Sequence, residues 1–298
     1  MTTPFLVACV QYCATDDLAA NLAAAEEGVR RARAAGASLI LLPENLAQMY
    51  PRDELLLDAA HTEEEHPALP RLQALARELA CHLLLGSLSI KRPSGRIHNR
   101  SYLLGPAGEV VATYDKIHLF DVALGGGEVY RESQAVEPGD RLVVAETPWG
   151  GLGLSICYDL RFAYLYRALA HAGAAFLSVP AAFTQMTGEA HWHTLLRARA
   201  IETGCYVFAS GQCGVRPWGR ATYGHSLIVD PWGHVLADAG PHPGICLAEV
   251  VPARVAEVRG QIPALRHDRL LSPPAGSSPP APDPAPNGDA LFGGAAIR

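Results

Sequence analysis

Three potentially reactive side chains lie where apolar segments of the chain end. Cys157 closes a strand-like run and is followed at once by a helical pattern. Glu44 and Lys116 each follow an apolar run of their own. Reactive groups are commonly presented on loops that a rigid scaffold of strands and helices positions. We therefore expect the thiol, the carboxylate and the ammonium group to share one site.

Nucleophilic catalysis is the chemistry that suits these three groups. A free cysteine has a pKa near ~8.5, so Cys157 needs a base to remove its proton at neutral pH. Glu44 is the candidate base, since a partly dry pocket would raise its pKa toward neutrality and let it take and return a proton. Lys116 can stabilise the negative oxygen that forms when a thiolate attacks a carbonyl, a contribution typically worth ~10² to 10³ in rate.

The same residue types also have ordinary structural roles. A lone cysteine at a strand end is usually packing, a glutamate after proline usually begins a solvated helix, and a lone lysine usually lies at the surface. Four histidines offer an alternative partner for the thiol or a metal site: His118, His191, His193 and His225. No His-Glu-x-x-His motif or Cys/His ligand spacing occurs, so we expect no metal. The run Gly125–Gly127 lacks the context of a nucleotide-binding loop, and we expect a flexible loop near the site.

Two similar series of strands and helices are expected to position these residues. The first half predicts strand, helix, parallel strand, helix, strand and hairpin over residues 5–11, 17–35, 38–43, 69–80, 82–90 and 101–114. The second half predicts strand, helix, strand, helix, strand and hairpin over residues 152–156, 161–171, 175–179, 188–203, 205–210 and 226–237. This doubled series predicts an α/β fold of two similar sheets with helices outside them.

The composition is that of a folded protein, and the absence of a membrane span or secretory signal leads us to expect a cytoplasmic one. The chain has 298 residues, of which 49% are hydrophobic, and its formal net charge is −6. Acidic and basic residues are spread along it, which argues against nucleic-acid binding. The chain has no run of ~18 apolar residues and no secretory signal, so we expect no membrane association. Seven scattered cysteines without a Cys-x-x-Cys pair argue against a disulfide framework and a zinc ribbon.

The domain organisation is predicted from a shift in composition near the C-terminus. We expect one folded domain over residues 1–271. Residues 272–298 begin with a stretch rich in proline, alanine and serine, which cannot form a packed core. This segment is expected to be a disordered tail without chemistry.

Three segments of the chain resemble the signature segments of the nitrilase superfamily of carbon-nitrogen hydrolases. They are Leu-Leu-Pro-Glu44-Asn, Tyr-Asp-Lys116-Ile-His-Leu-Phe-Asp and Gly-Leu-Ser-Ile-Cys157-Tyr-Asp-Leu-Arg-Phe, and their order also matches. The resemblance spans roughly residues 5–270. It implies a four-layer αββα sandwich, a Glu-Lys-Cys site, no cofactor, and a homodimer or higher homo-oligomer.

The resemblance also implies a role for each residue of the site. Cys157 would be the nucleophile, Glu44 the general base and acid, and Lys116 the oxyanion donor beside the backbone N–H of Tyr158. A second glutamate of this family follows the lysine segment and steadies the site. The motif Tyr-Arg-Glu-Ser places it at Glu132, with Glu128 as the alternative.

The residues after the nucleophile favour an amide over a nitrile. True nitrilases usually carry a Trp-Glu pair there, whereas this chain has Tyr158 and Asp159. The segment Pro180–Thr184 looks like the Nit branch, and we expect Tyr158, Phe183 and Thr184 to contact substrate. A substrate carboxylate needs a cation, for which Arg161 is the candidate; the alternative for Arg161 is a salt bridge with Asp159.

Within the Nit branch, the run Ala-Ile-Glu-Thr-Gly-Cys-Tyr-Val looks more like the deaminated glutathione amidases than the ω-amidases. The expected reaction is hydrolysis of a small 2-oxo-acid amide through a thioester, most simply deaminated glutathione to 2-oxoglutarate and Cys-Gly. The rival readings are an ω-amidase acting on 2-oxoglutaramate, another amide or carbamoyl hydrolase, and a catalytically silent binding or scaffold protein on the same fold.

Overall fold

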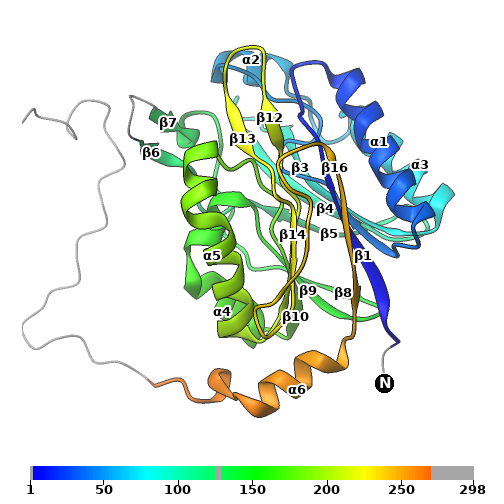
Figure 1. Cartoon of the computed structure of the whole chain (residues 1–298). Coiled ribbons are helices and arrows are strands. Elements are labelled where there is room, and N and C mark those ends of the chain that lie inside the picture. The colour runs from blue at the N-terminus through cyan, green and yellow to red at the C-terminus, as the bar shows by residue number, and fades with distance from the viewer. Residues whose placement is uncertain (1–2, 125–128, 270–298) are drawn as a thin grey trace, which may run out of the picture. The chain divides into compact units, whose positions relative to one another are not determined.

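A computed structural model of the chain describes residues 3–124 and 129–269 (Figure 1). Residues up to Arg266 belong to one compact unit. Three predictions lie outside the described residues: the loop Gly125–Gly127, the alternative glutamate Glu128 and the proline-rich tail over 272–298.

Two six-stranded sheets form the centre of this unit. The order in the first is β16-β1-β2-β3-β4-β5, and the order in the second is β15-β14-β11-β10-β9-β8. Strands of the first sheet are β1 (Phe5–Gln11), β2 (Leu39–Leu41), β3 (His82–Lys91), β4 (Ile97–Leu104), β5 (Val110–Asp115) and β16 (Gly244–Val250). Those of the second are β8 (Val144–Thr147), β9 (Gly150–Leu154), β10 (Ala174–Ser178), β11 (Tyr206–Ala209), β14 (Leu227–Val229) and β15 (Val235–Asp238).

Helices cover the outer face of each sheet, as Figure 1 shows with α1 and α3 on one side and α4 and α5 on the other. The helices are α1 (Leu18–Ala34), α2 (Asp53–Ala59), α3 (Ala68–Leu79), α4 (Ala163–His171), α5 (Gln185–Thr203) and α6 (Ala253–Gln261). Two small hairpins pair β6 (Asp121–Ala123) with β7 (Val129–Arg131), and β12 (Cys213–Val215) with β13 (Ala221–Tyr223). The predicted four-layer αββα sandwich is therefore confirmed.

The alternation of side chains along β1 explains why four layers form. Val7 and Cys9 join the core between the two sheets, whereas Ala8 and Val10 face the helices. Both faces of the strand are apolar and both are buried, so the sheet needs a covering layer on each side. The inter-sheet core includes an edge-to-face contact between Phe5 and Phe176, whose ring centroids lie 5.6 Å apart.

The predicted elements match most of the central strands and helices. The parallel pairing of β1 with β2 is observed, and the predicted strand at 5–11 has the same bounds as β1. The helix predicted over 161–171 begins later, because Cys157–Arg161 forms a 3₁₀ turn before α4. The sequence analysis missed β16, which pairs antiparallel with β1 from the far end of the chain.

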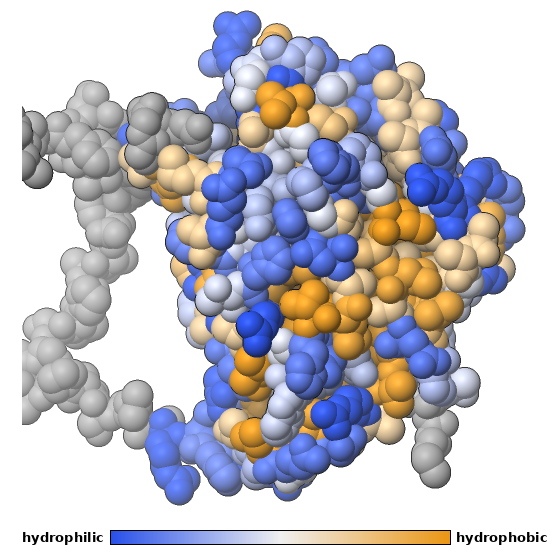
Figure 2. Space-filling model, in the orientation of Figure 1, coloured by the Kyte–Doolittle hydropathy of each residue, from blue (hydrophilic) through white to orange (hydrophobic). Residues whose placement is uncertain are grey.

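The surface mixes apolar and polar side chains. Figure 2 shows orange, apolar side chains in patches among blue, polar ones on the face that carries α5 and β16. Large apolar residues that are exposed include Ile201, Trp232, Val235 and Leu236. Homo-oligomerisation stays a prediction. Among residues 3–124 and 129–269, none of the helices combines the length and the apolar character needed to span a bilayer.

Candidate active site

Glu44 is held at the end of β2 by contacts from three segments. The next residue, Asn45, has a left-handed φ of 53° and donates its backbone N–H to Ser87 Oγ at 2.8 Å. Gln212 Nε2 donates to the backbone oxygen of Glu44 at 3.0 Å. Gly86 passes so close that a Cβ atom there would lie 2.2 Å from the backbone oxygen of Leu42. These contacts turn the Glu44 carboxylate into the interior, where its residue is only 3% exposed.

Lys116 directly follows β5 and joins two carboxylates. Its Nζ atom lies 2.9 Å from Glu44 Oε1 and 2.9 Å from each carboxylate oxygen of Glu132. Asn99 Nδ2 also donates to Glu44 Oε1, at 2.9 Å, and to Glu132 Oε1, at 3.3 Å. Lys116 is 2% exposed and Glu44 is 3% exposed, so this ion pair is shielded from water.

Glu132, the first candidate for the second glutamate, lies beside Lys116. It begins the 3₁₀ turn Glu132–Gln134, and its Oε2 accepts the backbone N–H of Phe120 at 2.6 Å. The structure thus brings Glu132 into contact with Lys116. Glu128, the alternative, lies outside the described residues.

Cys157 sits at a sharp turn between β9 and α4. Its φ is 50°, a conformation that non-glycine residues rarely adopt, and its backbone N–H donates to the oxygen of Pro180 at 2.9 Å. Asp159 stabilises this turn and is fully buried. Its carboxylate accepts hydrogen bonds from the backbone N–H of Ile156 at 2.9 Å and from Tyr114 Oη at 2.7 Å. Left-handed backbone at a non-glycine residue stores strain and is found more often at functional sites.

The protonation states of the site follow from its burial and its charges. Burial raises the pKa of Glu44, but Lys116, together with hydrogen bonds from Lys116, Cys157 and Asn99, outweighs burial and holds that pKa below its usual value. The expectation of a raised pKa for Glu44 is therefore wrong, because the ammonium group favours the carboxylate. Burial and the Glu44 charge raise the pKa of Cys157 well above its usual value. Burial acts to lower the pKa of Lys116, yet Glu132 and Glu44 raise it overall.

At neutral pH the site therefore holds a neutral thiol, an ionised carboxylate and an ammonium group. Cys157 and Glu44 line the same cavity and each shifts the pKa of the other, so an ionised carboxylate that can accept the thiol proton lies beside it. Lys116 supplies positive charge beside both. This arrangement suits attack of a thiol on a polarised carbonyl.

A cavity of about 140 Å³ opens over these groups. Glu44, Lys116, Glu132 and Cys157 all line it, and so do Tyr158, Arg161, Phe183 and Thr184, the four residues expected to contact substrate. The Arg161 guanidinium lies 5.3 Å from the ring centroid of Phe183 and 5.7 Å from that of Tyr158. Within the described residues Arg161 makes no ion pair with Asp159, and Arg161 lines the cavity.

The histidines have other partners. His118 Nδ1 lies 2.7 Å from Asp159 Oδ1, and its ring stacks on Phe162. His191 Nδ1 lies 3.3 Å from a guanidinium nitrogen of Arg161. Neither His118 nor His191 is among the described residues that line the cavity with the thiol. Glu44, by contrast, lines the cavity with Cys157.

The sequence analysis missed Asn99 and the arginines at the mouth of the cavity. Asn99 lies on the same face of β4 as Leu103, which joins the core between the sheets. A polar residue in an inward-facing position of a strand is the signal that would have indicated it. A second hollow adjoins the cavity and shares several lining residues with it, among them Arg52, Arg131 and Arg220.

Known proteins share this fold and this sequence. Residues 6–260 match the carbon-nitrogen hydrolase family. A deaminated glutathione amidase from Synechocystis sp. (strain PCC 6803 / GT-S) is 42% identical over 268 residues, which cover 89% of this chain and 98% of the relative. The NitFhit protein of C. elegans is 37% identical, with a TM-score of 0.85 over 90% of this chain and 66% of its own length.

A third similar protein bears on the cysteine. A mutant of an amidase from Nesterenkonia sp. AN1 is 28% identical, with a TM-score of 0.73 over 87% of this chain and 95% of its own. In that protein the acetamide moiety of fluoroacetamide is covalently added at the active-site cysteine. With the family match over most of its length, the chain belongs to the carbon-nitrogen hydrolases of the nitrilase superfamily, and it is a hydrolase of C–N amide bonds.

Proposed function

We propose that the chain hydrolyses deaminated glutathione to 2-oxoglutarate and Cys-Gly through a thioester on Cys157. The observation that carries this proposal is the cavity that Cys157 shares with a buried Glu44 carboxylate, which lies 2.9 Å from Lys116. The covalent adduct on the active-site cysteine of the Nesterenkonia amidase supports the nucleophile, and the name of the Synechocystis relative supports the substrate.

The first half of the reaction forms the thioester. Glu44 takes the thiol proton as the sulfur of Cys157 attacks the amide carbonyl. The carbonyl oxygen becomes negative and is stabilised by Lys116 and the backbone N–H of Tyr158. Collapse of this intermediate breaks the C–N bond, and the leaving amine takes the proton from Glu44.

The second half releases the acid. Glu44 removes a proton from water, whose oxygen attacks the thioester carbonyl. The same donors hold the second oxyanion, and its collapse expels the sulfur of Cys157, which recovers its proton from Glu44. Glu132 keeps Lys116 in place, because its carboxylate still binds the ammonium group when Glu44 takes a proton and loses its charge.

Substrate recognition depends on the arginines. Arg161 lies in the cavity and suits the carboxylate of the 2-oxo-acid part. The adjoining hollow contains three arginines against two carboxylates, those of Asp53 and Glu54, which suits the glycine carboxylate of a Cys-Gly leaving group. Arg220 is the sharpest candidate there, because its Nε atom is buried and has no hydrogen-bond partner among the described residues.

The test compares two amides that share the acyl part. Deaminated glutathione releases Cys-Gly, whereas 2-oxoglutaramate, the substrate of an ω-amidase, releases ammonia. We expect kcat/KM to be higher for deaminated glutathione by at least about tenfold, since only this substrate reaches the arginines of the mouth. Equal or higher kcat/KM for 2-oxoglutaramate would assign the chain to the ω-amidases.

The Arg220→Ala variant locates the origin of the preference. Loss of a charged hydrogen bond typically costs ~1.5 to 3 kcal/mol, so kcat/KM for deaminated glutathione should fall at least about tenfold. The value for 2-oxoglutaramate should stay unchanged. Arg92→Ala removes an exposed arginine that does not line either hollow and serves as the matched control.

A further inference from the structure

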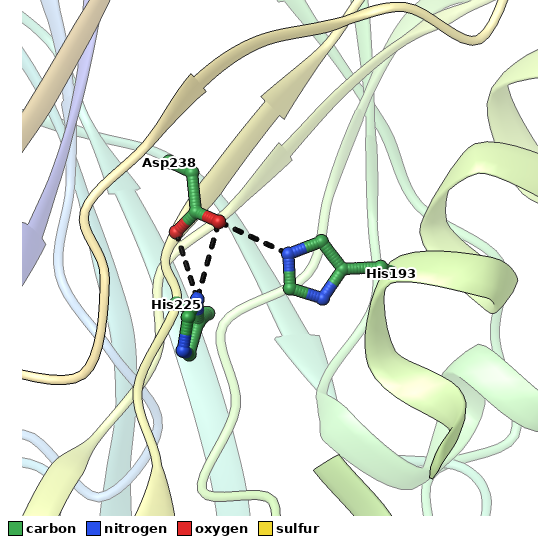
Figure 3. Close-up of side chains that lie close together, drawn as sticks. All are labelled: His193, His225 and Asp238. Carbon is green, nitrogen blue, oxygen red and sulfur yellow. Dashed lines mark hydrogen bonds and ion pairs between the residues drawn. The ribbon is translucent and has the colours of Figure 1, made fainter. Parts of the chain in front are cut away.

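A second group of chemically active side chains gathers away from Cys157. It consists of His193 in α5, His225 in the connection between β13 and β14, and Asp238 at the end of β15 (Figure 3). Asp238 Oδ2 lies 3.0 Å from His193 Nε2 and 3.1 Å from His225 Nδ1. One ligand atom from each residue lies within 4.8 Å of the other two. None of the three lines the cavity over Cys157.

The positions of these side chains are fixed by their backbone. His225 has a φ of 51°, donates its N–H to Gly240 at 2.8 Å and accepts at its oxygen from Trp192 Nε1 at 2.7 Å. Asp238 Oδ1 accepts the N–H of Gly240 at 2.8 Å. His193 lies on the same helix as Trp192, one residue further on. Hydrogen bonds therefore connect α5, the segment that carries His225 and the end of β15, and these connections hold the three side chains in place.

The charge of the group is unbalanced when both histidines are neutral. The Asp238 carboxylate accepts the backbone N–H of Gly240, and its oxygens lie 3.0 to 3.1 Å from ring nitrogens of His193 and His225. Within the described residues Asp238 makes ion pairs only with the two histidines, and neither arginine nor lysine neutralises it.

We infer that His193, His225 and Asp238 form a binding site for one divalent transition-metal ion of the zinc class. Two imidazole nitrogens and a carboxylate oxygen are ligands that Zn²⁺ prefers. Bonds of ~2.0 to 2.1 Å in tetrahedral geometry separate neighbouring ligand atoms by roughly 3.3 Å. The separations of 3.0 and 3.1 Å between Asp238 Oδ2 and the two ring nitrogens come close to this value.

The alternative is a hydrogen-bond group in which each ring donates an N–H to Asp238. Metal binding would replace both hydrogen bonds, and each ring would then carry its proton on the other nitrogen. The three side chains are between 22% and 35% exposed, so an ion and a water molecule in the fourth position can reach them. A bound ion would link α5 to the hairpin of β14 and β15.

The experiment measures zinc binding to the full chain without a histidine tag. The protein is stripped with a chelator and titrated with Zn²⁺ by calorimetry, and its thermal unfolding is followed with and without the ion. We expect one zinc ion per chain at this site and a higher melting temperature when it is bound. The His193→Ala and His225→Asn variants should each weaken this binding at least about tenfold and abolish the rise in melting temperature.

The choice of variants separates ligation from folding. Asparagine tolerates the left-handed backbone that His225 adopts, so His225→Asn keeps the local fold. His234→Ala is the control, because His234 faces Asp230 at 3.1 Å and is exposed, but it belongs to no such group of three. Zinc binding by cysteines would be the same in all variants. Absence of zinc binding, or equal affinity in the variants, the control and the unchanged chain, would overturn the inference.

Discussion

The Nζ atom of Lys116 lies 2.9 Å from Glu44 Oε1, and both side chains are almost completely buried. This ion pair decides the resting state of the site. It keeps Glu44 ionised beside the Cys157 thiol and keeps Lys116 charged. The ammonium group is then in position for the oxyanion that the thiol would create.

Replacing Lys116 with methionine should affect activity and stability together. The oxyanion would lose a donor, so kcat should fall by at least ~10² to 10³. Glu44 and Glu132 would be left as buried carboxylates without their cation, which typically costs ~3 to 5 kcal/mol. Steady-state kinetics and urea unfolding measure the two effects. Lys91→Met, at an exposed lysine, is the control, and equal losses in both variants would contradict the role of Lys116.

The pH dependence of kcat/KM should show a broad plateau. Activity requires an ionised Glu44, whose pKa is lowered from an ordinary value of 4.5, so the acid limb should lie below pH 4.5 and activity should fall as the pH drops through it. The raised pKa of Cys157 means that activity should not climb between pH 7 and 9 through thiol ionisation. An acid limb near pH 6.5, or a steep rise toward pH 9, would show that another group controls the thiol.

Asp159→Asn should disturb the turn that presents Cys157. The Asp159 carboxylate accepts hydrogen bonds from Ile156, Tyr114 and His118. In asparagine the NH₂ group would replace one accepting oxygen, so one of these donors would lose its acceptor and face another donor. We expect a loss of about 1 to 3 kcal/mol in unfolding free energy and a lower kcat. Asp140→Asn is the control, since the Asp140 side chain is 89% exposed. Unchanged stability and kcat in Asp159→Asn would contradict the role of the network.

Gly86→Ala should displace the segment that carries Glu44. The new Cβ atom would lie 2.2 Å from the backbone oxygens of Leu42 and Pro43, so one of the two backbones must move. We expect loss of stability and a fall in kcat with little change in KM. Gly260→Ala is the matched control in α6, where a Cβ meets nothing within 4 Å and a helix favours alanine by about 1 kcal/mol. Stability of Gly86→Ala equal to that of the unchanged chain would contradict this packing.

The sequence predicts features that depend on neighbouring residues, but not those that depend on contacts between residues far apart in the chain. Glu44, Lys116 and Cys157 each close an apolar run, so local patterns indicated all three, and the motifs around them indicated the family. Asn99 joins Glu44 to Glu132 only because the fold brings together β4, the segment after β2 and the 3₁₀ turn that begins at Glu132. The lowered pKa of Glu44 has the same origin, since it depends on a contact with Lys116, 72 residues away.

The group of His193, His225 and Asp238 shows the same limit for metal sites. The expectation of no metal rested on motifs in which ligands are close in sequence. Here the residues come from a helix, a connection and a strand end, and only the packing of α5 against the second sheet brings them together (Figure 3). Spacing along the chain therefore carries no signal for this group.

The central claim is that Cys157 carries the acyl part of the substrate during turnover. Mass spectrometry of the intact protein, quenched in acid during turnover of deaminated glutathione, tests it most directly. We predict a 2-oxoglutaryl adduct that maps to Cys157 and is absent from a folded Cys157→Ala variant, which should have no hydrolytic activity. Full turnover by Cys157→Ala, or an adduct on another residue, would contradict the claim.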